Sequence, residues 1–95
     1  MTAILVARYT VKNADKMEAY ATAAGPSVAA HGGEFIAQGE NVASLVGQDT
    51  SEAIAMVRFA DVATAKTWFA SPEYSACKDL RAQAADMQFT LYETA

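Results

Sequence analysis

Cysteine and histidine, the residues of disulfides and of most transition-metal sites, are almost absent from this 95-residue sequence. There is one of each. Cys77 alone cannot form an intramolecular disulfide, and a chain with so little cysteine is expected in the cytoplasm. A single histidine with a single cysteine also cannot supply the ligands of a structural zinc ion. We therefore expect no metal site of this kind, which leaves a carboxylate site as the alternative, and we assign no role to Cys77.

Positive charge and long hydrophobic runs are also lacking. Seven Lys and Arg residues stand against eleven Asp and Glu, for a net charge of −4. Nucleic-acid-binding proteins usually carry a basic stripe, and an acidic chain is not attracted to anionic lipid. No apolar run approaches the ~20 residues of a membrane span, and the first residues lack the basic segment of a signal peptide. We expect neither a nucleic acid nor a membrane as a partner.

What the sequence does have is the composition of a globular protein. Hydrophobic residues make up 53% of the chain and charged residues 19%, which is typical of a chain that folds around a core. Ninety-five residues are enough for one domain and leave no room for a second. We predict a single domain that spans residues 1–95.

Hydrophobic periodicity predicts four strands. Segments rich in β-branched and aromatic residues lie at 3–11, 34–38, 54–59 and 87–92. The second strand either ends near Gln38 or continues through Val42 to Val46, and the polar residues 47–52 form a loop.

Two helical segments separate these strands. Asn13 is a suitable N-cap for the first helix, which we expect Gly25-Pro26 to interrupt, since proline removes a backbone donor. A short turn over residues 27–30 and a left-handed Gly32 or Gly33 follow. Asp61 caps the second helical segment. Ser71-Pro72-Glu73 interrupts this segment and starts its final part, which we expect to be a single last helix. The order βαββαβ predicts a ferredoxin-like fold, an α+β four-stranded antiparallel sheet with helices on one face.

Alternation along the strands predicts that both faces of this sheet are apolar. The face beneath the helices is expected to hold Leu5, Ala7, Tyr9, Phe35, Ala37, Val57, Phe59, Phe89 and Leu91. An antiparallel sheet covered on one side normally has a polar second face, but here that face holds Ile4, Val6, Ile36, Ile54, Met56 and Tyr92. A patch of this kind indicates a partner surface, and the simplest partner is a second copy related by a two-fold axis. We predict a homodimer.

Three polar residues are expected on the same partner-facing side, namely Arg8, Gln38 and Arg58. Arginine buried at an interface needs a partner, because an unpaired buried charge is costly. Either an acid such as Glu34, Glu93 or one from the other subunit satisfies the arginines, or they bind an anionic ligand inside the dimer. The first alternative is favoured, since arginine is common at interfaces without any ligand.

Three short motifs carry a resemblance to a known family. They are Ala30-His31-Gly32-Gly33 after the first helix, Trp68-Phe69 followed by Ser71-Pro72-Glu73-Tyr74, and Leu80-Arg81. On these motifs the whole chain resembles the small bacterial proteins of domain-of-unknown-function family 1330, within the dimeric α+β barrel superfamily. Tyr20 also falls where members tend to carry tyrosine. Members often have arginine at the position of Gln38 and glutamate at that of Arg58, so this chain departs from their pattern at both.

The resemblance implies a fold and a dimer rather than a reaction. The family has no established activity, and the superfamily includes cofactor-free monooxygenases, haem-degrading enzymes, lactone isomerases and small-molecule-binding proteins. A fold alone does not select among these functions. We expect no bound cofactor.

His31 is the single candidate for acid–base chemistry. A reference pKa near ~6.5 suits imidazole to proton transfer around neutral pH, which would make His31 a catalytic base. Alternatively His31 ends the first helix, where histidine complements the helix dipole. The two glycines that follow favour this second interpretation.

Aromatic residues and one arginine define a candidate ligand-binding cleft between the helices and the sheet. Its candidate residues are Tyr9, Tyr20, Trp68, Tyr74 and Arg81, with Arg81 available to hold a carboxylate or enolate oxygen. The alternative is that these side chains are ordinary core. Two functional hypotheses result. In one, a homodimer binds a small organic metabolite in this cleft, with or without cofactor-independent oxygenase or isomerase chemistry. In the other, it is a non-catalytic binding or regulatory module.

Overall fold

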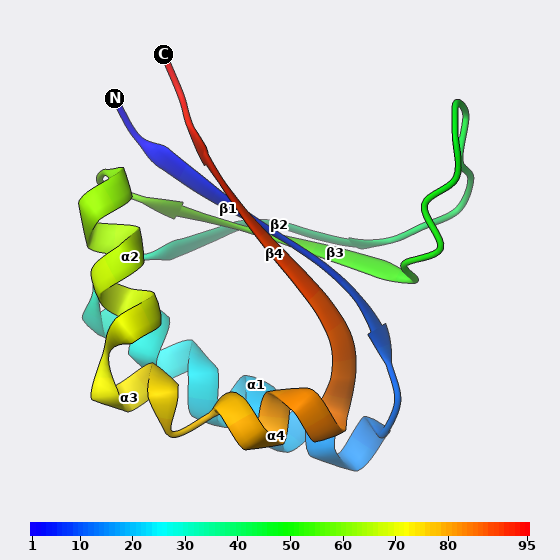
Figure 1. Ribbon diagram of the computed structural model, residues 1–95, viewed down its shortest axis with the longest axis horizontal. Coiled ribbons are helices and arrows are strands. Elements are labelled where there is room, and N and C mark those ends of the chain that lie inside the picture. The colour runs from blue at the N-terminus through cyan, green and yellow to red at the C-terminus, as the bar shows by residue number, and fades with distance from the viewer.

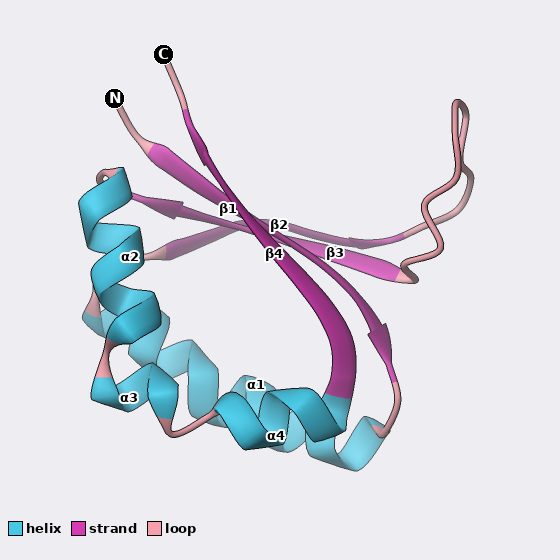
Figure 2. Cartoon of the chain, viewed as in Figure 1, coloured by secondary structure: helices cyan, strands magenta, loops and turns pink.

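Four strands and four helices account for most of the chain in the computed structural model, which describes residues 1–95 (Figure 1). The elements are β1 (Ala3–Val11), α1 (Ala14–Ala30), β2 (Glu34–Glu40), β3 (Ala53–Phe59), α2 (Val62–Ala70), α3 (Pro72–Ser75), α4 (Lys78–Ala84) and β4 (Ala85–Glu93). Neighbouring strands are antiparallel, in the order β2-β3-β1-β4. All helices lie on one side of the sheet (Figure 2). The predicted ferredoxin-like α+β fold is therefore confirmed. No helix is both long and apolar enough to cross a bilayer.

The helix starts are set by the side chains that the sequence predicted. Asn13 Oδ1 accepts a hydrogen bond from Lys16 N at 3.0 Å, and Asp61 Oδ1 accepts one from Thr64 N at 2.7 Å. Ser71 Oγ accepts from Tyr74 N, with Pro72 at the first helical position. Each cap satisfies a backbone donor that has no partner inside its helix.

The prediction that Gly25-Pro26 interrupts the first helix is wrong, because α1 runs unbroken from Ala14 to Ala30 with Pro26 inside it. Proline normally forces the preceding residue out of helical conformation, since its Cδ clashes with that residue's Cβ. Gly25 has no Cβ, so this clash is absent. The turn after Pro26 is held by buried Ser27 and Val28, and Ser27 Oγ donates to Ala24 O at 2.6 Å. Packing therefore outweighs the hydrogen bond that proline removes.

Replacing Pro26 with alanine is expected to stabilise the protein by about 1 kcal/mol, since it restores one backbone hydrogen bond at an exposed position. Gly25→Ala is expected to destabilise the wild type, because the new Cβ meets the Pro26 ring, but to stabilise the Pro26→Ala background, where helix propensity alone decides. Urea unfolding of the two single variants and the double variant measures both effects. A Gly25→Ala change of the same sign in both backgrounds would contradict this account.

Several element boundaries differ from those predicted. β2 ends at Glu40 and residues 42–46 form no strand, so of the two alternatives the one in which the strand continues through Val46 is wrong. The single last helix is divided into α3 and α4 by Ala76 and Cys77. β4 begins at Ala85, two residues earlier than predicted. These boundaries depend on pairing with distant segments, which local pattern does not reveal.

A β-bulge in β2 changes which side chains face the helices. Phe35 pairs with Val57 but Ala37 pairs with Met56, so the register shifts between Phe35 and Ala37. Beyond the bulge every residue is moved to the other face. The predicted faces of Ala37 and Gln38 are therefore both wrong, since Gln38 pairs with Ala55 on the helix-covered face.

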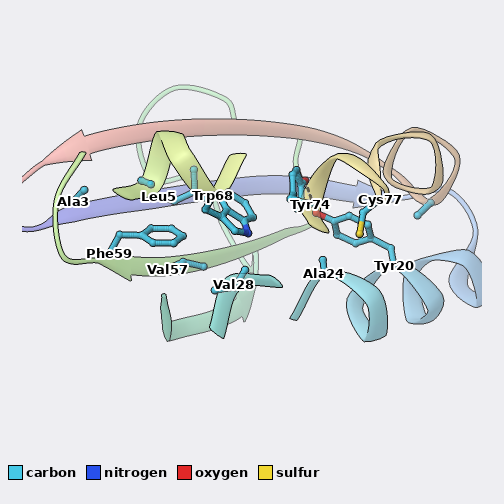
Figure 3. Close-up of a cluster of buried hydrophobic side chains, with 12 residues drawn as sticks. Ala3, Leu5, Tyr20, Ala24, Val28, Val57, Phe59, Trp68, Tyr74 and Cys77 are labelled. Atoms are coloured by element: carbon cyan, nitrogen blue, oxygen red, sulfur yellow. Dashed lines mark hydrogen bonds between the residues drawn. The ribbon is translucent and has the colours of Figure 1, made fainter. Parts of the chain in front are cut away.

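The core lies between the helices and the covered face of the sheet. Figure 3 shows the centre of this core, which contains Phe59 of β3, Trp68 of α2 and Tyr74 of α3, all of them buried. The ring centroids of Trp68 and Tyr74 are 4.3 Å apart, and those of Trp68 and Phe59 5.4 Å apart. Trp68 therefore packs against both Phe59 of β3 and Tyr74 of α3.

Candidate functional site

A cleft of about 330 Å³ lies between α1 and the covered face of the sheet, and we call it the helix–sheet cleft. Fourteen of its sixteen lining residues are hydrophobic, and the other two are Gly25 and Gln38. The sheet contributes Leu5, Ala7, Tyr9, Phe35, Gln38, Ala55, Val57, Met87 and Phe89, and the helices contribute Met17, Tyr20, Ala21, Ala24, Gly25, Val28 and Trp68. No charged side chain lines this cleft.

Three of the predicted ligand-binding residues line the cleft, namely Tyr9, Tyr20 and Trp68. Two polar groups among them are already occupied. Trp68 Nε1 donates to Ser27 Oγ at 3.1 Å, and the Tyr20 hydroxyl lies 2.8 Å from the Tyr74 hydroxyl. The Tyr9 hydroxyl and the Gln38 amide form no hydrogen bond within the chain. They remain available for a ligand.

The other two predicted residues, Tyr74 and Arg81, lie behind the cleft rather than in its wall. Arg81 Nη1 donates to the Tyr74 hydroxyl at 2.8 Å. Its guanidinium also lies over the rings of Phe69, Tyr74 and Phe89, at 5.7, 5.6 and 5.4 Å. Arg81 is thus held by an aromatic cluster and does not point at a ligand carboxylate. The hydrogen bonds connect Arg81 through Tyr74 to Tyr20, and the Tyr20–Tyr74 bond is drawn in Figure 3.

Burial is the main cause that raises the pKa of Tyr20, and the hydrogen bond to Tyr74 adds to it. The Tyr20 phenol is therefore neutral at physiological pH. In this state it can donate a hydrogen bond but is a poor base. No Asp, Glu, His or Lys side chain lines the cleft either.

His31 lies at the end of α1, where its backbone N–H donates to Val28 O at 3.1 Å. Its side chain is 21% exposed and is not part of the cleft wall; its Nε2 lies 3.7 Å from Glu73 Oε2 of α3. Gly32 follows with a φ of +72°, the left-handed conformation predicted for one of the two glycines. The position is that of a helix-ending residue that also links two helices.

The pKa of Glu73 is lowered from its usual value of 4.5, first by the hydrogen bond from its own backbone N–H, then by Ser71 and by His31. A carboxyl group whose pKa is lower in the folded state stabilises the fold above its unfolded pKa. That contribution disappears as the pH falls through the folded value.

Urea midpoints measured between pH 6 and pH 3 are expected to fall below about pH 4.5 and to fall less steeply for Glu73→Gln. Glu18→Gln, at an exposed site on α1, is the control and should leave the slope unchanged. Equal slopes for wild type and Glu73→Gln would contradict the proposed linkage.

The arginines predicted to face a partner are satisfied within the chain. Arg58 Nη2 donates to Glu34 Oε2 at 2.6 Å, across strands β2 and β3. Arg8 Nε lies 3.6 Å from Asp49 Oδ2, a partner that the sequence did not suggest. The bulge turns Gln38 to the opposite face of the sheet from both arginines, so it belongs to the cleft instead. No three His, Cys, Asp or Glu side chains come together as a metal site.

Sequence reasoning missed Met17, Met87 and Phe89 as cleft residues, and misplaced Gln38. Met17 had no predicted role, and Phe89 was expected only on the face of the sheet beneath the helices. Methionine and phenylalanine carry no chemical signal that separates a cleft wall from a core. The bulge that reorients Gln38 also has no clear sequence signature.

The strand order, the position of all helices on one face of the sheet and the apolar cleft beneath them define the class of fold. Solved structures that match the chain include a dabb family protein with a ferredoxin-like fold, at 16% identity, so the class of fold is ferredoxin-like. A family model for Domain of unknown function (DUF1330) matches residues 2–95. The chain belongs to the DUF1330 family. No curated protein matches it.

Three solved structures illustrate how similar the folds are. A protein of unknown function from Rhodopseudomonas palustris, RPA0582, has a TM-score of 0.85 at 17% identity, over 99% of this chain and 82% of that one. SnoaB, a cofactor-independent oxygenase from Streptomyces nogalater, has a TM-score of 0.71 at 16% identity, over 99% and 93%. A dimeric ferredoxin-like protein of unknown function from Thermobifida fusca has a TM-score of 0.67 at 16% identity, over 99% and 92%. At these identities the likeness is one of fold.

Proposed function

We propose that the protein is a cytoplasmic homodimer that binds one uncharged, largely apolar organic molecule in the helix–sheet cleft of each subunit. The observation that carries this proposal is a cleft of about 330 Å³ with an apolar wall and no charge. Clefts of this size with few polar groups are the usual form of small-molecule sites. The volume suits a two- or three-ring compound.

The residues that line the cleft disfavour the binding of a charged ligand, because none of them is charged. A carboxylate placed in the cleft would lose its hydration and meet no cation, because Arg81 is held by Tyr74 and three aromatic rings. Such an unpaired buried charge is strongly unfavourable. A carbonyl or hydroxyl group, in contrast, can bond to the Gln38 amide or the Tyr9 hydroxyl. The ligand class is therefore a neutral ring system with one hydrogen-bonding group.

The second copy in this proposal covers the open face of the sheet, the one that carries no helices. Val6 is buried there between its neighbouring strands, but Ile36 and Tyr92 remain exposed, and Ile4, Ile54 and Met56 are partly exposed. These apolar side chains form the surface that a two-fold partner would bury. The dimeric state described for a protein of the same fold supports this arrangement.

Cofactor-independent oxygenase chemistry is a second candidate, supported by the fold shared with SnoaB. Such chemistry requires a substrate that gives up a proton, and no base lines the cleft. Binding without turnover is therefore the better-supported function. Isomerase chemistry meets the same objection, since it too needs a proton acceptor.

Trp68 is the only tryptophan and lines the cleft, so its fluorescence reports occupancy directly. We expect 9-fluorenone, a planar neutral ketone, to quench Trp68 saturably. We expect 9-fluorenone-2-carboxylate to bind at least about 30-fold more weakly, because its charge has no partner. Ala21→Phe, at the exposed wall of α1, is expected to block binding, whereas Ala23→Phe on the same helix outside the cleft is the matched control.

Three outcomes decide between the candidates. Equal binding to Ala21→Phe and Ala23→Phe would place the ligand elsewhere and overturn the proposal. Preference for the carboxylate would overturn the ligand class. Consumption of dissolved oxygen with bound ligand would establish oxygenase activity, whereas recovery of unchanged ligand would support a binding module.

A further inference from the structure

The segment between β2 and β3, residues 41–52, extends away from the rest of the molecule, and we call it the arm (Figure 1). It carries three aliphatic side chains that contact no part of the core. Val42, Leu45 and Val46 are 95%, 92% and 97% exposed. Single exposed apolar residues are ordinary, but three within five positions of one protruding segment form an apolar surface that water wets poorly.

Hydrogen bonds give the arm a defined shape. Asn41 N donates to Glu52 O at 2.8 Å and closes its base. The Asn41 side chain donates to Asp49 O and Ser51 O, each at 3.1 Å, and Asp49 Oδ1 accepts from Ser51 N. The arm therefore presents its aliphatic side chains from an organised scaffold, which lowers the entropy that binding would remove.

The direction of the arm relates it to the open face. Arg8 lies on the open face of β1, and its ion pair with Asp49 fixes the arm to that side. In Figure 1 the arm also rises on the side of the sheet away from the helices. The arm is therefore directed toward the space that a partner subunit on the open face would occupy. The Arg8–Asp49 ion pair therefore lies between the apolar side chains of the open face and those of the arm.

We propose that the arm clasps a second copy of this chain, with Val42, Leu45 and Val46 packed against the partner subunit. The proposal rests on the homodimer proposed above. A two-fold axis through the facing sheets would give each subunit an arm that reaches the other, so the contact forms twice in a closed dimer. The acidic groups Glu40, Asp49 and Glu52 at the base of the arm disfavour insertion into an anionic membrane.

The test compares a triple variant, Val42→Ser with Leu45→Ser and Val46→Ser, with the wild type by sedimentation velocity over a concentration series. We expect the dimer dissociation constant to rise at least about 30-fold, because the exposed side chains stabilise the dimer and not the monomer fold. The matched control is Gln48→Ala with Thr50→Ala, which removes polar side chains from the same arm and should leave the constant unchanged. Amide exchange at residues 42–46 should slow in the wild-type dimer and not in the triple variant.

Different results would overturn different parts of the proposal. A wild type that sediments as a monomer at micromolar concentration would refute the homodimer and the clasp together. A dimeric wild type with an unchanged constant in the triple variant would refute the clasp alone. Wild-type binding to neutral phosphatidylcholine vesicles, lost in the triple variant while dimerisation is unchanged, would assign the arm to a lipid surface instead.

Discussion

Replacing Tyr74 with alanine is expected to lower the free energy of unfolding by about 3–5 kcal/mol, enough to unfold a marginal domain. Tyr74 is 0% exposed, and its ring lies 4.3 Å from that of Trp68 and 5.5 Å from that of Phe69. The alanine variant loses these contacts and leaves a cavity. It also removes the hydroxyl that binds both Tyr20 and Arg81.

Tyr74→Phe separates the ring from the hydroxyl. It keeps the packing but leaves the Tyr20 hydroxyl and the Arg81 guanidinium without their partner, so we expect a loss of about 1–3 kcal/mol. Urea unfolding at a fixed protein concentration measures both variants, since dimerisation would make stability depend on concentration. A Tyr74→Phe variant as stable as the wild type would show that the hydrogen bonds contribute nothing.

The second large effect is expected at Gly33, where alanine should cost about 2–3 kcal/mol. A Cβ at this position would lie 2.5 Å from Val28 Cγ1 and 2.8 Å from Phe59 Cε1. Both side chains are buried, at 3% and 1% exposed, so either contact requires a shift within the core. Gly33 therefore maintains the close approach of β2 to the end of α1, and backbone conformation is not the reason for it.

Two comparisons distinguish this steric cause from others. Val28→Ala removes the closest atom, so Gly33→Ala should cost less in that background, measured as a coupling energy by a double-mutant cycle. Gly32→Ala has no steric neighbour but requires a positive φ, and Asn should be better tolerated there than Ala. An unchanged cost of Gly33→Ala in the Val28→Ala background would exclude the clash with Val28.

Most of the fold could be predicted because its signals are local. Asn13, Asp61 and Ser71 are short-range caps, and strand alternation identified the face that packs against the helices, with the exception of Ala37 and Gln38. The errors arise where distant segments decide. Pro26 stays within α1 because the following turn is buried, and the β2 bulge depends on pairing with β3.

The candidate site was predicted only in part, for a related reason. Residue type identified the aromatic side chains, so Tyr9, Tyr20 and Trp68 were expected in the cleft. The same signal could not separate them from Tyr74, which lies behind Tyr20 and supports it. Whether an aromatic ring lines a cleft or packs beneath it depends on the relative placement of α1 and α3, and periodicity along one helix carries no information about that.

The two ends of the chain are joined by hydrogen bonds at the side of the sheet remote from the arm (Figure 1). Thr94 N donates to Thr2 O at 2.8 Å, and the two threonine hydroxyls lie 2.6 Å apart. A short peptide linker could therefore connect residue 95 to residue 1, and new ends could be opened between Gly47 and Gln48. Such a circular permutant would keep every strand pairing but would break the backbone at the tip of the arm. The importance of an unbroken arm could then be measured without deleting a residue.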